Sequence, residues 1–282
     1  ATMKAIRDQD AGLIGRRLAV FRQRSNLPVP LPRGKENQPV HPSLAHIDHR
    51  PWPLPKSRWT WRQSWRDLLF AHWPIDANAL RPLVPEGLKI QEFDGTAWIA
   101  VVPFRMTGVM RRPFPDLPWI SAFPELNVRT YVEREGRPGV WFLSLDATNP
   151  LAVWAARTFF HLPYHRAAMA LVDDGRRIEY RSQRGDARFE GTYGPASEVH
   201  AAAPGSLEHW LTERYCLYAR DLSGSIWRND VHHEPWPLQR AEADLRVNTM
   251  LAPHRLVVSD RPALLHFARR IDVVVWSGER VG

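Results

Sequence analysis

The chain has few of the features that mark secreted, membrane or motif-defined proteins. It contains a single cysteine, Cys216, so an intrachain disulfide is impossible and a reduced, cytoplasmic setting is expected. It contains no run of about 18 apolar residues, so no membrane span is expected. It also lacks a Gly-x-Ser-x-Gly nucleophile elbow, a glycine-rich phosphate or dinucleotide loop, and a paired-cysteine motif. No common catalytic or cofactor motif therefore assigns a function.

The charge distribution argues against nucleic-acid binding by the folded body. The formal net charge is +8, and residues 1–62 hold 12 Lys and Arg against 4 Asp and Glu. The whole excess thus lies at the N-terminal end, and the remaining 220 residues are balanced, with 26 basic and 26 acidic groups. A nucleic-acid surface would need a basic patch on the body itself.

Residues 1–55 are predicted to form a basic, proline-rich arm and linker, and residues 56–282 the folded domain. Apolar residues at near-helical spacing around residues 6–21 are interleaved with arginines, and residues 27–55 carry eight prolines. A basic amphipathic segment can contact a membrane surface or a partner. The alternative is a mobile extension without a partner.

The body is predicted to be rich in strands. The whole 282-residue chain has 25 Pro and 16 Gly, which favours many short elements joined by turns. Residues 133–139, Glu-Arg-Glu-Gly-Arg-Pro-Gly, separate two apolar runs and indicate a hairpin. The expected strands include residues 96–104, 126–132, 140–145, 176–181, 187–192, 241–251 and 271–276. Such spacing predicts an antiparallel barrel or sandwich.

Four short helices are expected, at residues 76–83, 150–160, 206–214 and 262–270. The second has the clearest ends. Asn149 is a suitable N-cap, Pro150 suits the first helical position, and Pro163 must stop the helix.

Three segments resemble the acetoacetate decarboxylases: residues 66–90 (RDLLFAHWPIDANALRPLVPEGLKI), 123–141 (FPELNVRTYVEREGRPGVW) and 142–165. Phrases such as Val-Pro-Phe-Arg-Met, Asn-Val-Arg-Thr-Tyr-Val and Glu-Pro-Trp-Pro-Leu resemble more closely the YqjF-like family of uncharacterised bacterial proteins, in the same superfamily. The resemblance covers about residues 58–282. It implies a mainly β (α+β) fold, an antiparallel acetoacetate decarboxylase-like β-barrel with a few short helices around a central pocket.

The resemblance also implies four site residues. The family's carboxylate-handling arginine matches Arg66 and its pocket glutamate matches Glu125. Its imine-forming lysine matches Tyr164, and the neighbouring lysine that lowers the pKa of the first matches His165. A tyrosine cannot form an imine, and none of the chain's four lysines stands at that position. Imine-based decarboxylation is therefore not expected.

Two functions remain. One is an enzyme that acts on a small keto- or hydroxy-carboxylate without an imine, by enolisation, hydration–dehydration or a lyase-type step, with Tyr164 as a hydroxyl donor and His165 as a proton shuttle. The other is a non-catalytic β-barrel that binds an apolar or aromatic metabolite. An Arg66–Glu125 ion pair and a structural His165 are the purely structural alternatives. No cofactor or metal is expected, and a homo-oligomer remains open.

The remaining histidines and Cys216 have structural explanations. His232, His233 and Glu234 are consecutive and rarely converge on one metal ion, so a turn at the pocket mouth is expected instead. His72 is expected in the core, and His161 as a cap of the helix that ends there. Cys216 lies in an apolar stretch and is expected to be buried.

Overall fold

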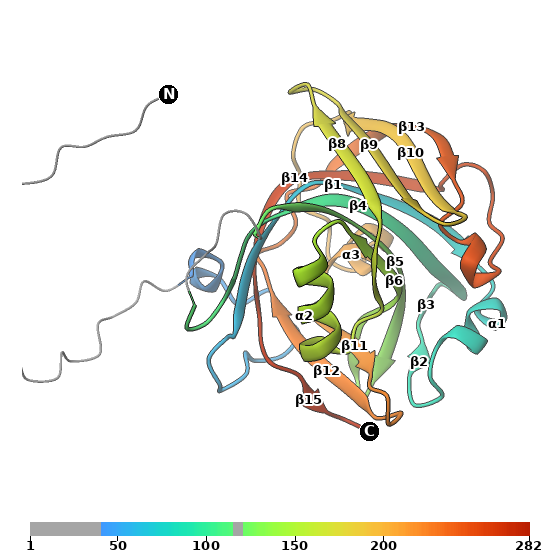
Figure 1. The fold of residues 1–282 in the computed structure, drawn as a ribbon. Helices are drawn as coiled ribbons and strands as arrows, with labels where there is room; N and C mark the ends of the chain where they lie inside the picture. The colour runs from blue at the N-terminus through green and yellow to red at the C-terminus, as the bar shows by residue number, and fades with distance from the viewer. Residues whose placement is uncertain (1–40, 115–120) are drawn as a thin grey trace, which may run out of the picture. The chain divides into compact units, whose positions relative to one another are not determined.

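The computed structural model describes residues 41–114 and 121–282, and the mainly β prediction is confirmed there (Figure 1). The predicted amphipathic segment around residues 6–21 lies outside the described residues. The strands are β1 (Trp61–Ile75), β2 (Lys89–Ile90), β3 (Glu92–Phe93), β4 (Thr96–Arg111), β5 (Phe123–Arg134), β6 (Arg137–Ala147), β7 (Tyr164–Arg166), β8 (Ala168–Asp173), β9 (Ile178–Arg184), β10 (Ala187–Pro195), β11 (Cys216–Arg220), β12 (Ile226–His232), β13 (Gln239–Asn248), β14 (Leu264–Val275) and β15 (Glu279–Arg280). The α-helices are α1 (Ala77–Leu80), α2 (Pro150–Phe160) and α3 (Leu207–Thr212).

Seven strands pair with one another in a closed ring, which is called the ring below. Following hydrogen-bonded neighbours, β12, β11, β6, β5, β4, β1 and β14 lie in that order, and β14 pairs again with β12 through Val231 with Val275 and His232 with Val274. All these neighbours are antiparallel except β6 and β11. The predicted hairpin at residues 133–139 joins β5 to β6 through Glu135 and Gly136, both of which have positive φ.

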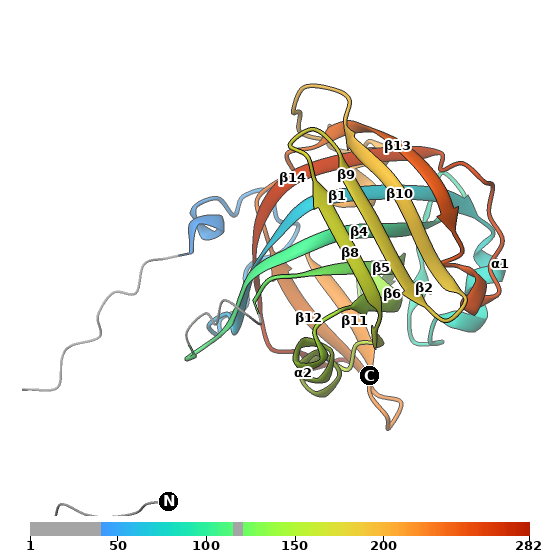
Figure 2. The same cartoon turned by 45° about the horizontal axis from the view of Figure 1, so that its top comes forward.

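Strands β8, β9, β10 and β13 form an outer layer over this ring, as Figure 2 shows. Ring strands β1, β4 and β5 are therefore buried on both faces, which explains the nearly continuous apolar run at residues 96–104. Tyr180 and Tyr193 of the outer layer fasten it to the ring by donating to the backbone oxygens of Glu125 and Asp67, at 2.7 and 2.9 Å.

A β-bulge in β1 changes which of its residues face the inside of the ring. Asp67 has a φ of 55°, and the register between β1 and β4 shifts in the stretch from Arg66 to Ala71. Before the bulge the odd-numbered Trp65 faces inward, and after it the even-numbered Leu68 does. Arg66 therefore lies on the outer face of the ring.

Helix α2 lies over one open end of the ring (Figures 1 and 2). The Asn149 side chain accepts hydrogen bonds from the amides of Leu151 and Ala152, at 2.9 and 3.2 Å, so the predicted cap is confirmed. The helix ends at His161, whose φ of 54° is left-handed and whose amide donates to Ala156. No helix in the described part of the chain is long and apolar enough to cross a membrane.

The helix predicted for residues 262–270 is wrong, because this segment begins the long strand β14. It pairs with β1 from His72–Leu264 to Trp61–Val275 and with β13 at Gln239–Phe267 and Arg240–His266. Strand neighbours on both sides outweigh the weak local helix preference of Ala-Leu-Leu-His-Phe-Ala-Arg-Arg.

Residues 41–55 contact β12. The Arg50 side chain is buried and donates to Asp230 Oδ1 at 3.3 Å and to the Val231 carbonyl at 2.5 Å. Trp52 Nε1 donates to the same Asp230 oxygen at 2.9 Å, and His232 contacts the Ser43 carbonyl at 2.5 Å. The boundary between residues 55 and 56 stays a prediction, but the last part of the predicted linker packs on the folded body.

Candidate functional site

A cavity of about 140 Å³ lies inside the ring. Its lining residues come from all seven ring strands and from α2. An apolar cavity of about 150 Å³ is large enough to hold benzene. The cavity therefore has room for a small organic molecule.

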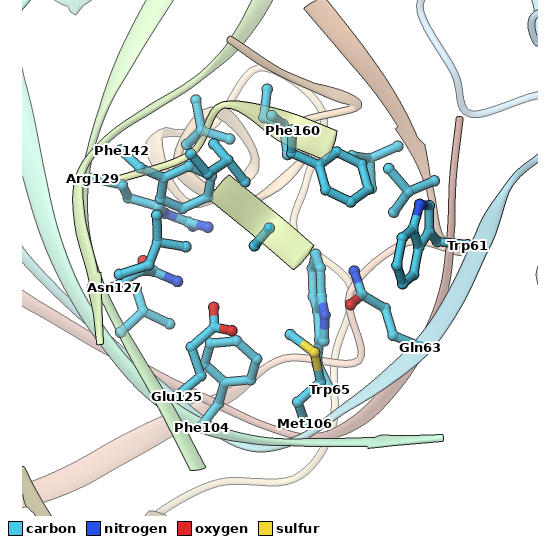
Figure 3. Close-up of a pocket in the computed structure, with 18 of the residues that line it drawn as sticks. Trp61, Gln63, Trp65, Phe104, Met106, Glu125, Asn127, Arg129, Phe142 and Phe160 are labelled. Atoms are coloured by element: carbon cyan, nitrogen blue, oxygen red, sulfur yellow. The ribbon is translucent and has the colours of Figure 1, made fainter. Parts of the chain in front are cut away.

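Most of the cavity wall is aromatic or aliphatic. Figure 3 shows Trp61 and Trp65 of β1, Phe104 of β4, Phe142 of β6 and Phe160 of α2 around the space. Such walls exclude water and strengthen the electrostatic effect of any polar group among them. The few polar groups in the wall thus determine what the cavity can do chemically.

Strand β5 supplies three polar groups in a row. Side chains alternate between the two faces of a strand, so Glu125, Asn127 and Arg129 face the same side, and Figure 3 shows all three directed into the cavity. The intervening Leu126 and Val128 point to the other face of β5, where they are fully buried in the hydrophobic core between the ring and the outer layer.

Glu125 and Tyr164 meet inside the cavity. The Tyr164 hydroxyl donates to Glu125 Oε2 at 2.7 Å, and the two residues are 7% and 2% exposed, respectively. Burial raises the pKa of Glu125 from its ordinary 4.5 to about 8; the Tyr164 hydrogen bond opposes the rise and nearby Asp146 adds to it. Burial and the Glu125 charge also hold the pKa of Tyr164 well above its ordinary value. Tyr164 thus stays a hydroxyl donor, while Glu125 changes charge near neutral pH.

The turn after α2 brings Tyr164 to this place. After His161 the chain passes through Pro163 into β7, which runs parallel to β6 with Tyr164 beside Leu145. His165 is the next residue on the strand, so it points to the other side, and it is not among the residues that line the cavity. Burial, with Arg184 and Arg157 nearby, lowers the pKa of His165.

Arg66 also lies away from the cavity. Its Nε donates to Thr107 Oγ1 at 3.2 Å, and no ion pair joins Arg66 to Glu125 among the described residues. Of the four residues that the resemblance implies, the structure brings together Glu125 and Tyr164 and places Arg66 and His165 outside the cavity wall.

Two arginines that the sequence analysis missed line the cavity instead. Arg129 comes from β5, and Arg214 follows α3. The signal for Arg129 was present in the Glu-x-Asn-x-Arg alternation of residues 125–129, which places three polar side chains on one face of a strand otherwise made of core residues. Arg214 carries no comparable signal, because it follows a short helix and reaches the cavity only through the tertiary fold.

The histidines beside the cavity do not form a metal centre. His232 points toward Ser43 and Arg50, whereas His233 lines the cavity and contacts the Glu234 carbonyl at 2.7 Å. No group of three His, Cys, Asp or Glu side chains suited to a metal occurs within residues 41–114 and 121–282. His72 is fully buried and contacts the Tyr131 hydroxyl at 2.7 Å, as expected for a core histidine. Cys216 is buried, and this burial raises its pKa to about 12.

Comparison with known proteins identifies the family. The model of DUF2071, described as an uncharacterized conserved protein, matches residues 62–272. The chain belongs to the DUF2071 family. The uncharacterized protein YqjF of Bacillus subtilis (strain 168) is 46% identical over 226 residues, which cover 79% of this chain and 93% of YqjF. The resemblance to YqjF-like proteins is thus confirmed.

Solved structures extend this DUF2071 fold to the acetoacetate decarboxylase-like enzymes. The acetoacetate decarboxylase of Legionella pneumophila has a TM-score of 0.56 and 14% identity, over 87% of this chain and 97% of that one. The enduracididine biosynthesis enzyme MppR, in complex with pyruvate, has a TM-score of 0.56 and 12% identity, over 83% and 93% of the two chains. At these identities the likeness shows a shared fold.

Proposed function

We propose that the protein is an enzyme that moves a proton beside the carbonyl group of a small molecule held in the cavity, without forming an imine. The seven-strand ring then acts as a closed barrel that shields the reaction from water. The observation that carries the proposal is the hydrogen bond between Tyr164 and Glu125 in an otherwise largely apolar wall.

The two side chains supply the two groups that enolisation needs. The Glu125 carboxylate takes a proton from the carbon next to the carbonyl, the C–H electron pair forms a carbon–carbon double bond, and the carbonyl π electrons move to oxygen. When the ligand is bound, the Tyr164 hydroxyl turns from Glu125 Oε2 and donates its one hydrogen bond to that oxygen instead, which stabilises the enolate and frees the carboxylate to act as the base. Return of the proton from Glu125 to carbon or oxygen completes the turnover.

The pKa of Glu125 supports its assignment as the base. A general base works best when its pKa is close to the operating pH, and burial brings the pKa of Glu125 to about 8. The rate should therefore rise with pH up to about 8, as the carboxylate form becomes populated, and level off above it. The carboxylate form is the active one because only it can accept the proton.

The fold of the neighbours supports a small-molecule ligand. MppR has been solved with pyruvate bound, and it shares this fold. The imine chemistry of acetoacetate decarboxylases needs an amine at the position of Tyr164, which a phenol cannot provide. Proton transfer next to a carbonyl is the part of such chemistry that Glu125 and Tyr164 can perform without an amine.

Hydrogen–deuterium exchange tests the proposal directly. Wild-type protein in deuterium oxide should accelerate the loss of the α-proton NMR signals from members of a panel that contains pyruvate, acetoacetate, 4-oxopentanoate and 5-oxohexanoate. Glu125→Gln should abolish the acceleration, and Tyr164→Phe should reduce it roughly 10²- to 10³-fold, as loss of one oxyanion donor does. Glu92→Gln, which removes an exposed carboxylate on β3, is the matched control and should exchange like wild type.

A non-catalytic binding protein is the second candidate, and the aromatic wall favours it. Trp61, Trp65, Phe104, Phe142 and Phe160 would serve an apolar or aromatic metabolite equally well. If the panel binds in the cavity but exchanges no faster than in buffer, the enzyme proposal is wrong and this one stands.

We further propose a cytoplasmic location, supported by the lone, buried Cys216, and a boundary near residue 55 between the basic arm and the domain. A homo-oligomer remains one alternative for the assembly.

A further inference from the structure

One part of the cavity wall carries buried positive charge that makes no ion pair among the described residues. The Arg129 side chain comes from β5, and the residue is only 7% exposed. Its Nε and Nη2 atoms are buried and have no hydrogen-bond partner in the part of the chain that the structure describes. The guanidinium lies 5.2 Å from the Phe70 ring centre and 5.8 Å from that of Tyr131, and aromatic rings stabilise a cation only modestly.

Arg214 adds a second guanidinium to the same wall. It is 6% exposed, its Nε donates to the Trp210 carbonyl at 2.8 Å and its Nη1 donates to Gln91 Oε1 at 2.5 Å. Its Nη2 atom is buried without a partner. Burial, together with the neighbouring Arg129 charge and against the opposing effects of Tyr131, Cys216 and Glu133, lowers the pKa of Arg214 to about 10, so the group remains charged at neutral pH.

Unpaired buried charges of this kind are costly to the fold. Burying an ion without a counter-ion costs several kcal/mol, and a buried N–H group without an acceptor adds to that cost. Among the described residues neither arginine makes an ion pair, although 17 such pairs join other residues there. An anionic group of a bound ligand would neutralise the charge and satisfy the free donors of Arg129.

The place of Arg129 on the strand sets the length of such a ligand. Glu125 and Arg129 are four residues apart on one face of β5, with Asn127 between them (Figure 3). Four residues of a strand span about 13 Å, at about 3.3 Å each. Subtracting two hydrogen bonds of about 2.9 Å leaves roughly 7 Å between the ligand's carbonyl and its anionic group.

We propose that Arg129 and Arg214 form an anion subsite, and that the ligand is a carboxylate whose carbonyl stands about 7 Å away, across an apolar spacer. In a 2- or 3-keto acid the two groups are only one or two bonds apart, too close to reach Glu125 and Arg129 together. A linear keto acid with three or more intervening methylene groups fits the span, and so does an aromatic ring between the groups. The Phe104 and Phe142 side chains then contact the spacer. Only the carbonyl end of this assignment rests on the proposed function, because the anion subsite stands on the arginines alone.

Calorimetry on a graded ligand series tests the proposal with wild-type protein. The series is pyruvate, acetoacetate, 4-oxopentanoate, 5-oxohexanoate, 6-oxoheptanoate and 4-acetylbenzoate, and affinity should rise with the separation of the two groups. The methyl ester of 4-acetylbenzoate keeps the shape and loses the charge. It should bind roughly 10- to 100-fold more weakly than the acid, the range that a charge-assisted hydrogen bond supports.

Variants locate the subsite. Arg129→Met should weaken the binding of 4-acetylbenzoate by the same factor as esterification does. It should leave the affinity for acetophenone, which lacks the carboxylate, within about 2-fold of the wild-type value. Arg66→Met is the matched control, since Arg66 lies outside the cavity wall, and it should bind the acid like wild type. If Arg129→Met does not fold, the acid-to-ester ratio on wild-type protein decides the question.

The outcomes separate this proposal from the proposed function. Equal affinity for the acid and its ester overturns the proposed anion subsite. Tighter binding of pyruvate than of 5-oxohexanoate overturns the proposed distance between the ligand's carbonyl and carboxylate groups. Binding of 4-acetylbenzoate that depends on Arg129, without exchange of its methyl protons, supports the subsite and counts against proton transfer by Glu125.

Discussion

Replacing Glu125 by glutamine should make the protein more stable at pH 8 while abolishing the proposed proton transfer. Burial raises the pKa of this carboxyl from 4.5 to about 8, so the folded state favours the protonated, neutral form. Glutamine is nearly isosteric with that form, keeps an oxygen that can accept from Tyr164, and does not ionise.

The sign and size of this change in the free energy of unfolding follow from proton linkage. A carboxyl whose pKa is higher in the folded state favours folding below its unfolded pKa, and this advantage is lost as pH rises from 4.5 through about 8. Over the interval from pH 5 to pH 8 the wild-type free energy of unfolding should fall by about 3.5 kcal/mol because of this one group. Glu125→Gln should lack that loss.

Urea unfolding at pH 5 and pH 8 measures the difference. With a denaturant slope of about 3 kcal/mol per molar, the gap between the variant's and the wild type's midpoints should widen by about 1 M between the two pH values. Glu92→Gln removes an exposed carboxylate and controls for general charge effects, so its midpoint should match that of wild type at both pH values. A constant difference between wild type and Glu125→Gln at pH 5 and pH 8 would refute the reasoning, because it would mean that Glu125 does not titrate abnormally in the folded state.

Three further predictions concern the linker, the N-terminal residues and the missing amine. Arg50→Ala leaves buried Asp230 with the Trp52 Nε1 hydrogen bond and with Arg228 and Arg137 as ion-pair partners at 3.7 and 3.9 Å, and should cost about 3 kcal/mol, or about 10 °C in Tm. Deletion of residues 1–40, which have few apolar anchors, should shift Tm by less than about 2 °C in the same calorimetric scan, and a larger drop would show that those residues stabilise the body. Borohydride reduction with pyruvate or acetoacetate should leave no adduct detectable by mass spectrometry, because no lysine stands at the position of Tyr164. An adduct on any lysine, together with carbon dioxide release, would contradict the non-imine mechanism.

Local signals in the sequence were sufficient for much of the fold. Asn149, Pro150 and Pro163 predicted the bounds of α2 because capping and proline geometry act within a few residues. The turn at residues 133–139 predicted the β5–β6 hairpin for the same reason. Residues 262–270 were wrongly predicted as a helix because their strand pairing with β1 and β13 involves residues far away in the chain.

Two of the four residues predicted for the candidate site, Glu125 and Tyr164, line the cavity in the structure. Strand alternation separates Tyr164 from His165 once one of them is taken to face inward, and the family resemblance pointed to Glu125. The same alternation would have placed Asn127 and Arg129 beside Glu125. The raised pKa of Glu125 could not be predicted, because it depends on how completely the ring and α2 exclude water.

The β-rich composition, the caps and turns, and the absence of an imine-forming lysine follow directly from the residues, since each of these depends on residue type or on near neighbours. Which arginine reaches the cavity depends instead on how distant strands pair. Arg66 precedes the bulge at Asp67 and faces outward because Trp65 faces inward, and the bulge then turns Leu68 inward. The alternation of β5 from Glu125 turns Arg129 inward, and the fold brings Arg214 to the same wall. A one-residue shift in strand register reverses the side to which every later side chain points, and only the pairing of distant strands fixes that register.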